Sequence, residues 1–177
     1  MRPTLLAVAV LAAALCSRTM SAADPPKRSP ELQVLDRFVG TWDFVVINQL
    51  IGGETVTGKT SETRTWTLGG KFVQWQNPKT EKPDEPEVQM LVTYDPATKT
   101  YPGVLMNSTS PALVTGTWDE SKQTMTFSGT FADSSGNKFS FTNRFTDNDH
   151  CEAAGTIRDA VGKVFLEQTQ KQTRRKK

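Results

Sequence analysis

Few side chains in this sequence combine the residue types and the spacing that metal binding or catalysis requires. The single histidine, His150, lies within residues 147–152, whose sequence DNDHCE also holds a cysteine and several acids. The order of these ligands matches no zinc pattern, and a calcium loop would need a glycine at its sixth position. We therefore predict a polar turn between two strands, with a metal site as the alternative, and no cofactor.

Catalysis by an activated nucleophile is not supported by the sequence. A Ser-His-Asp or Cys-His arrangement would have to be built around His150, and no G-x-S-x-G nucleophile elbow is present. The pairs Gly52-Gly53 and Gly69-Gly70 lie where hairpin turns are expected and not before helices, so they are not phosphate-binding loops. We assign no catalytic residue. The alternative is an enzyme that acts on a small substrate through carboxylate and arginine groups inside a cavity.

The remaining candidate is a pocket lined by aromatic side chains and a few polar groups, which is the usual form of a small-molecule site. The residues predicted to bind the ligand are Trp42, Glu62, Arg64, Trp66 and Asn143. Because side chains alternate along a strand, an inward Trp66 brings Arg64 and Glu62 inward with it. A buried arginine needs a carboxylate partner or an anionic ligand, since an unpaired buried charge is very costly. The alternative is that the tryptophans fill the core and Arg64 lies near the rim with its guanidinium in water.

These side chains must be positioned by β-strands, because everything after Gly40 has the composition of strands and turns. Segments rich in Thr, Val, Phe and Trp alternate with clusters of Gly, Pro, Asp, Asn and Ser. About ten strands are expected, including residues 42–50, 62–68, 71–76, 88–94, 101–107, 113–118, 125–131, 139–145, 152–158 and 164–170. Sequential strands without crossover helices predict an all-β, antiparallel up-and-down barrel, which leaves no exposed edge. A barrel of this size can hold a small ligand or be filled by its own side chains.

One short helix is expected before the barrel. Ser29 is a capping residue, Pro30 suits the first helical position, and Glu31 places an acid in the first turn. Apolar residues between positions 32 and 39 follow at helical spacing, and Gly40 ends the helix. We expect this helix to close one end of the barrel.

The first residues have the order of a secretory signal peptide. A basic start precedes an apolar run over residues 5–16, and this run is well short of the ~20 residues of a membrane-spanning helix. Small residues at Ser21 and Ala23 predict cleavage before Asp24, so residues 1–23 form the signal and the protein is secreted or periplasmic. A lipoprotein is the alternative, but Leu15 stands before Cys16 where such signals place Gly, Ala or Ser.

The mature chain is expected to be one domain with two flexible ends. Residues 24–30 form a disordered linker, residues 31–170 the barrel, and residues 171–177 a basic disordered tail. The formal charge of +2 disappears with the signal peptide, so the basic tail is attached to an acidic body. This distribution argues against nucleic-acid binding, although the tail could make weak contact with an anionic surface.

Cys151 is the only cysteine that remains after removal of the signal peptide. An intramolecular disulfide and a cysteine metal cluster are therefore excluded in the mature chain. We expect a buried, inert thiol, with a reactive or intermolecular role as the alternative.

Three segments in order resemble a known family. They are LDRFVGTW at residues 35–42, WTLGGKF at 66–72 and YDPATKTY at 94–101. Together they resemble a mostly bacterial family of secreted proteins, domain of unknown function 1579. The resemblance implies a lipocalin-like (calycin-type) barrel and no agreed activity. Relatives often carry Trp and Asp in the strand after the Tyr-Asp turn, where this chain has Leu105-Met106-Asn107.

These observations favour a secreted barrel that binds a small molecule or an envelope component without performing chemistry. Besides the enzyme described above, a structural envelope protein held by its basic tail is the other alternative. A core without a cavity would favour that structural role, whereas a cavity would favour a ligand.

Overall fold

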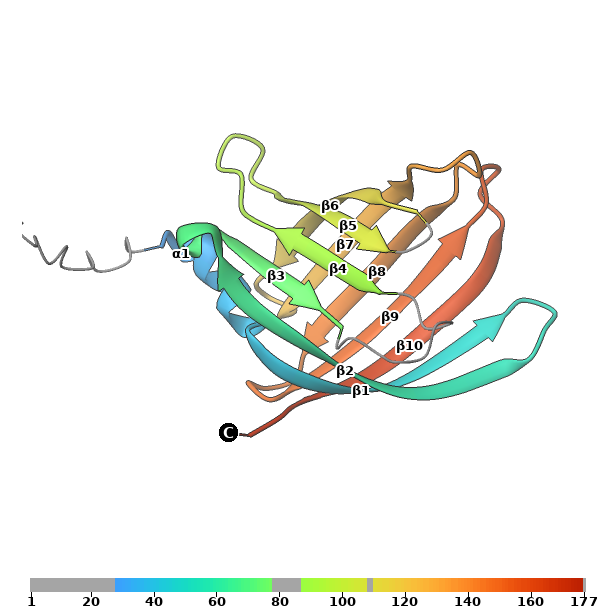
Figure 1. Cartoon of the computed structure of the whole chain (residues 1–177), viewed down its shortest axis with the longest axis horizontal. Coiled ribbons are helices and arrows are strands. Elements are labelled where there is room, and N and C mark those ends of the chain that lie inside the picture. The colour runs from blue at the N-terminus through green and yellow to red at the C-terminus, as the bar shows by residue number, and fades with distance from the viewer. Residues whose placement is uncertain (1–27, 78–86, 108–109, 177) are drawn as a thin grey trace, which may run out of the picture.

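The described part of the chain forms a closed barrel. The computed structural model describes residues 28–77, 87–107 and 110–176, which build ten antiparallel strands preceded by a short helical segment (Figure 1). The predicted all-β, up-and-down barrel with a short N-terminal helix is thus confirmed. The predicted signal peptide, residues 1–23, and residues 24–27 of the predicted linker lie outside the described residues.

The helical segment consists of two short turns, α1 (Pro30–Gln33) and the 3-10 turn η1 (Val34–Arg37). A further 3-10 turn, η2, spans Leu68–Gly70. The strands are β1 (Gly40–Leu50), β2 (Thr55–Thr67), β3 (Phe72–Gln76), β4 (Val88–Val92), β5 (Tyr101–Asn107), β6 (Ala112–Asp119), β7 (Thr124–Phe131), β8 (Lys138–Phe145), β9 (His150–Arg158) and β10 (Val164–Arg174). Within the described ranges, no helix is both long and apolar enough to cross a bilayer.

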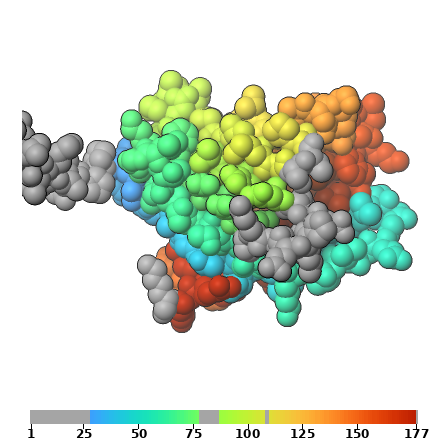
Figure 2. All heavy atoms as spheres, in the orientation of Figure 1, coloured from blue at the N-terminus to red at the C-terminus, as the bar shows by residue number. Residues whose placement is uncertain are grey.

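Each strand pairs with its neighbour in the sequence, and β1 pairs also with β10, which closes the barrel. Trp42 on β1 lies opposite Glu62 on β2 and opposite Arg174 on β10. Trp42 and Phe44 are buried while Asp43 between them is exposed, so side chains alternate between interior and solvent as expected. In the space-filling view, the side chains of β3 to β6 cover the side of the barrel that faces the viewer, and the β1–β2 hairpin (cyan) projects at one end (Figure 2).

The segment before β1 closes the other end of the barrel. The Ser29 hydroxyl accepts a hydrogen bond from the Leu32 amide at 3.2 Å, and Pro30 occupies the first helical position, so the predicted helix start is confirmed. The single predicted helix is instead an α-turn followed by a 3-10 turn, a common tightening of a final turn. Leu35 and Phe38 of this plug are fully buried. Here and below, the plug means residues 30–39.

The C-terminal strand is longer than predicted. The barrel was expected to end at residue 170 and a disordered tail to follow, but β10 continues through Arg174. The reason is that two cations of this segment have partners, since Arg174 bonds to carbonyl groups and Arg175 forms an ion pair with Asp43. The domain also begins before the predicted residue 31, because Arg28 of the predicted linker contacts Asp36 at 3.0 Å.

Candidate functional site

A cavity of about 510 Å³ occupies the half of the barrel that is farther from the plug. Its floor is formed by Arg64 and Trp75, which contact Phe38 of the plug, and its other end reaches the exposed residues Gly58 and Lys59. The size lies within the range of roughly 300–1,000 Å³ that is usual for small-molecule sites. The described core is therefore not completely filled by its own side chains.

Arg64 is the central polar residue of the floor. Its side chain is 1% exposed, its Nε donates to Glu62 Oε1 at 2.6 Å, and its Nη2 donates to Gln172 Oε1 at 3.1 Å. The alternative that placed this guanidinium in water at the rim is therefore wrong. Four aromatic rings surround the guanidinium carbon at centroid distances of 4.3 to 5.5 Å: Phe38, Trp42, Phe44 and Trp75.

Two donors on this floor have no acceptor in the described part of the protein. They are Arg64 Nη1 and Trp75 Nε1, and both are buried. Arg64 and Trp75 lie opposite each other in the β2–β3 register, with the guanidinium carbon 4.3 Å from the ring centroid. Buried donors are nearly always paired, so two adjacent orphans point to an acceptor supplied by a bound molecule.

The charges of the cavity divide between its floor and its mouth. Among the described lining residues the charged side chains are Lys59, Glu62 and Arg64. Glu62 and Arg64 form an ion pair on the floor, whereas Lys59 is exposed. Lys59 therefore adds a cation at the mouth, in contact with solvent, and the floor pair carries no net charge.

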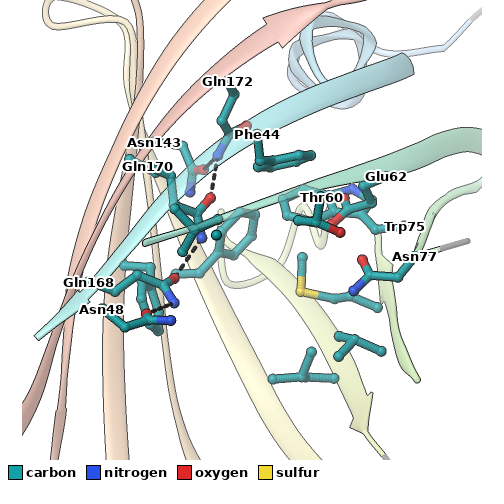
Figure 3. Close-up of a pocket in the computed structure, with 18 of the residues that line it drawn as sticks. Phe44, Asn48, Thr60, Glu62, Trp75, Asn77, Asn143, Gln168, Gln170 and Gln172 are labelled. Carbon is teal, nitrogen blue, oxygen red and sulfur yellow. Dashed lines mark hydrogen bonds between the residues drawn. The ribbon is translucent and has the colours of Figure 1, made fainter. Parts of the chain in front are cut away.

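A chain of hydrogen-bonded amides runs from Arg64 along one wall, and we call it the amide ladder. Gln172 Nε2 donates to Gln170 Oε1 at 2.9 Å, Gln170 Nε2 to Gln168 Oε1 at 2.6 Å, and Gln168 Nε2 to Asn48 Oδ1 at 2.6 Å (Figure 3). The direction of the ladder follows from Arg64, because a guanidinium can only donate. Gln172 must offer it an oxygen, which turns its NH₂ group towards the next oxygen along the ladder.

The strands across the barrel from the ladder supply an apolar wall. Its residues come from β4, β5, β7 and β8 and are Val88, Met90, Leu105, Phe127, Phe131, Phe139 and Phe141. Their only hydrogen-bonding group is the weakly accepting sulfur of Met90, and the Asn77 amide lies beside Val88. The cavity thus has one mainly polar side and one mainly apolar side.

Three glycines make room for the phenylalanines of this wall. Gly116, Gly129 and Gly155 lie directly opposite Phe127, Phe139 and Phe141 in the strand register. A Cβ atom on any of them would come within 2.6 to 2.7 Å of an atom of its partner ring. The rings therefore lie against bare backbone, which keeps them out of the centre of the barrel.

The five residues predicted to bind a ligand divide into two groups. Glu62, Arg64 and Asn143 line the cavity. Trp42 and Trp66 do not, because their indole N–H groups donate to Phe38 O and to Asp36 Oδ1, both at 2.7 Å, and so hold the plug in place. Strand alternation placed Trp42 correctly in the interior, but it could not reveal that the plug occupies this end of the barrel. Ligand contact stays a prediction for the other three.

Sequence reasoning missed the ladder and Trp75. The signal was present as QTQKQ at residues 168–172, where glutamine recurs at every second position and therefore on one face of a strand. It was missed because β10 was expected to end at residue 170, inside the pattern. Trp75 carried no signal of its own, since only the register of β3 places it beside Arg64.

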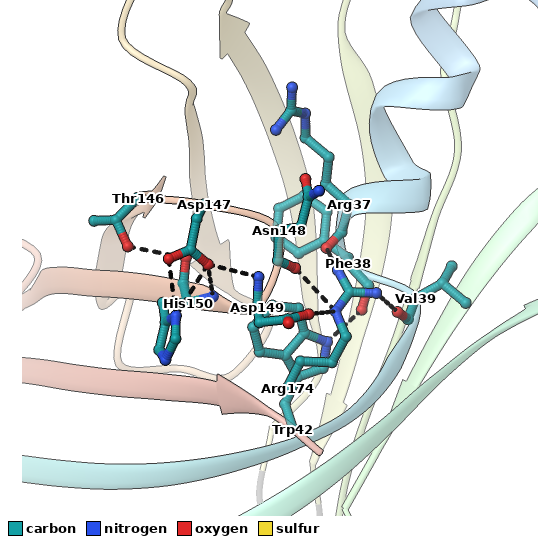
Figure 4. A network of polar contacts seen from close by, with 10 residues as sticks. All are labelled: Arg37, Phe38, Val39, Trp42, Thr146, Asp147, Asn148, Asp149, His150 and Arg174. Carbon is teal, nitrogen blue, oxygen red and sulfur yellow. Dashed lines mark hydrogen bonds and ion pairs between the residues drawn. The ribbon is translucent and has the colours of Figure 1, made fainter. Parts of the chain in front are cut away.

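Arg174 ties the plug to the last strand on the closed end of the barrel. Its three nitrogens donate to the carbonyl groups of Asn148, Val39 and Arg37, and its guanidinium carbon is 4.6 Å from the Trp42 ring centroid (Figure 4). These contacts join the plug to the turn between β8 and β9. The closed end is thus a structural region of the molecule.

The predicted polar turn at residues 147–152 lies beside Arg174. Asp147 Oδ1 accepts hydrogen bonds from the amides of Asp149 and His150, which lower the pKa of its carboxyl group, and its carboxylate also contacts His150 Nδ1 at 2.9 Å. Across the described ranges, no three His, Cys, Asp or Glu side chains are grouped so that they could hold a metal. Cys151 is buried, and this burial raises the pKa of its thiol to about 12.

The comparisons with known proteins identify a family and a fold. A family model described as "Protein of unknown function (DUF1579)" matches residues 27–164. No curated protein matches this sequence.

Several solved structures resemble the barrel. The S-type phycobiliprotein lyase CPES from Guillardia theta is 15% identical with a TM-score of 0.57, covering 82% of this chain and 92% of that one. Rv2717c from M. tuberculosis is 12% identical with a TM-score of 0.61, covering 85% and 100%. A DUF3598 protein of unknown function from Nostoc punctiforme is 9% identical with a TM-score of 0.54, covering 80% and 48%. At these identities the likeness concerns the fold alone.

Proposed function

The chain belongs to the family described as "Protein of unknown function (DUF1579)", and from its cavity we propose that it binds an amphipathic organic acid inside the barrel. The acidic group of this ligand reaches Arg64 and Trp75 on the floor, and its apolar body fills the space towards the mouth. Binding without chemical conversion is the function that the site supports best.

The observation that carries the proposal is the pair of orphaned donors, Arg64 Nη1 and Trp75 Nε1. Leaving one buried donor without an acceptor costs about 1–3 kcal/mol, and more when the group is charged. A carboxylate has two oxygens and can accept from both donors at once.

The lining favours binding over catalysis. Glu62 is the only carboxylate among the described residues that line the cavity, and Arg64 already holds it at 2.6 Å. An enzyme that worked through paired acids, which was the alternative from the sequence, would need a second carboxylate facing the first. The described lining offers none, whereas it offers an extensive apolar surface for a ligand body.

The ligand is proposed to be bound outside the cytoplasm. The support is the sequence of residues 1–23, which has the order of a secretory signal. Mass spectrometry of the protein released from the periplasm of a bacterial host should give a chain that begins at Asp24. Retention of residues 1–23 in the cytoplasmic fraction would contradict this proposal.

Contact of the basic C-terminal segment with an anionic surface is a weaker part of the proposal. Two of its five cations are engaged within the protein, because Arg174 bonds to carbonyl groups and Arg175 pairs with Asp43. Lys171 and Lys176 are exposed. Sedimentation with anionic vesicles at low salt, compared with neutral vesicles, measures this contact.

The acid-binding site can be tested with ligands that share a chain and differ in charge. The neutral dye Nile red is bound first, and decanoate or decyltrimethylammonium is then used to displace it. We expect displacement by decanoate with at least about ten-fold higher affinity, because only the carboxylate can accept hydrogen bonds from the two donors. In the double variant Arg64→Met/Glu62→Gln, this preference should disappear. Equal displacement by both chains in the unmodified protein would contradict the proposal.

A further inference from the structure

The two unlike walls of the cavity bear on the shape of the ligand. We propose that the cavity selects facially amphipathic acids, in which hydrogen-bonding groups lie along one long side of a rigid body and the other side is apolar. This inference rests on the proposed function, since it adds a shape to the acid held by Arg64 and Trp75.

The amide ladder is the polar wall. Gln168, Gln170 and Gln172 occupy alternate positions of β10, so with ~3.3 Å per residue the ladder extends about 13 Å along the strand. Gln168 and Gln170 each use one N–H and one lone pair within the ladder. Each of these two amides therefore keeps one donor and one acceptor for a hydroxyl group on a ligand.

The wall opposite the ladder offers little to a polar group, apart from the Asn77 amide beside Val88. Four strands separate β10 from β5 on each side of the closed barrel, so Leu105 of β5 faces the cavity from directly across. Met90 and Phe131 extend this apolar surface on β4 and β7. A hydroxyl pressed against these side chains would lose its water without gaining a partner.

A simple hydrocarbon chain ending in an acid would use only part of this site. Its carboxylate would reach Arg64, but its methylene groups would cover Gln168 and Gln170 and remove water from their free N–H and C=O groups. A rigid body with hydroxyl groups along one side replaces those lost hydrogen bonds. The lining therefore favours the facially amphipathic acid over the simple chain.

Two epimeric acids of identical composition separate these ligand shapes. Chenodeoxycholate carries both ring hydroxyls on one face, whereas ursodeoxycholate has one of them moved to the opposite face; both serve as probes and share the same carboxylate. Isothermal titration of the full mature chain, below the micelle concentrations, should give a Kd about ten-fold lower for chenodeoxycholate, since the moved hydroxyl would be buried without a partner. Equal Kd values would overturn the facial preference and leave acid binding intact. Failure of both probes to bind a protein that binds decanoate would overturn the facial selection alone, whereas failure of all three acids would overturn the acid-binding function as well.

A substitution in the amide ladder tests whether this wall causes the preference for chenodeoxycholate. Gln170→Leu removes the middle amide and should bring the two Kd values within about two-fold of each other, mainly by weakening chenodeoxycholate. Thr169→Leu adds an apolar side chain at the neighbouring, exposed position of the same strand and should leave the ten-fold preference unchanged. A preference that survives Gln170→Leu, in a protein whose thermal unfolding matches that of Thr169→Leu, would overturn the assignment.

Discussion

Two arginines lie close to the same tryptophan and have different environments. The guanidinium carbon of Arg174 is 4.6 Å from the Trp42 ring centroid and that of Arg64 is 5.4 Å from it. At the closed end, all three nitrogens of Arg174 donate to carbonyl groups. On the cavity floor, one nitrogen of Arg64 has no partner among the described residues.

The difference teaches that burial alone does not identify a binding residue. Arg64 is the more deeply buried of the two, with 1% of its side chain exposed against 25% for Arg174. What distinguishes them is whether the protein itself satisfies every donor. Our proposal assigns the donor left over at the cavity to a ligand, whereas a completely bonded guanidinium marks a structural joint.

The largest expected effect is on the closed end. Arg174→Met leaves three carbonyl groups without their donor, so the free energy of unfolding should fall by about 3 kcal/mol. Urea unfolding followed by circular dichroism measures this change. Lys171→Met, on the exposed face of the same strand, is the control and should stay within about 0.5 kcal/mol of the unmodified protein. Similar losses in both variants would show that Arg174 is no structural joint.

The next effect concerns the wall that keeps the cavity open. In Gly155→Ala the new Cβ would lie 2.5 Å from Ser140 O and 2.6 Å from Phe141 Cγ, so the ring must shift. We expect a loss of about 2 kcal/mol in the free energy of unfolding. Gly58→Ala is the matched control, because no atom lies within 4 Å of its Cβ position. If both variants unfolded at the same urea concentration, the glycine would not be needed for the ring.

A smaller effect is expected when the ion pair on the cavity floor is removed as a unit. The double variant Arg64→Met/Glu62→Gln should change the free energy of unfolding by less than about 1 kcal/mol, because apolar or neutral replacements of a whole buried pair are often tolerated. Arg64→Met alone should cost more, since Glu62 then loses its cation. A double variant as unstable as Arg174→Met would remove the distinction between the two arginines.

A further effect, confined to alkaline pH, is a pH dependence at the closed end. Burial raises the pKa of the Cys151 thiol to about 12, so the folded protein keeps a proton that the unfolded chain loses at about pH 8.5–9. The stabilisation is complete below that unfolded-state pKa and is lost as the pH rises towards the folded-state value. The free energy of unfolding should therefore decrease between about pH 9 and pH 11, and less steeply in Cys151→Ala.

Tyr101 contributes in the same direction, because burial raises the pKa of its phenol to about 12. Its contribution to the free energy of unfolding begins to fall only above the unfolded-state pKa of about 10, which is higher than that of the thiol. Urea unfolding at several pH values separates the two groups, since only the thiol contribution disappears in Cys151→Ala. Identical pH profiles for Cys151→Ala and the unmodified chain would show that the thiol keeps its usual pKa.

The fold was predictable because its signals are local. Hairpin turns and two-residue alternation indicated ten sequential strands, and alternation alone placed Glu62 and Arg64 inside the barrel. The site was predictable only in part, because the depth of each side chain along the barrel depends on where the plug ends. That dependence moved Trp42 from the expected pocket to the closed end.

The cavity itself depends on register, which the sequence does not display. The glycines of β6, β7 and β9 have no special significance until each is known to face a phenylalanine across the strand pair. In the same way, Trp75 becomes part of the floor only because it lies opposite Arg64. Pairs formed between strands therefore account for most of what was missed.

Closure of the barrel between its first and last strands also has a consequence for how the protein is made. The ion pair between Asp43 and Arg175 joins residues 132 positions apart, and contacts of such separation form late because the loop between them must be ordered first. A chain emerging from the ribosome or from a translocon carries β1 and β2 long before β10 exists. The floor around Arg64 is completed by Gln172 of that last strand, so the proposed binding site is complete only when the whole barrel has been assembled.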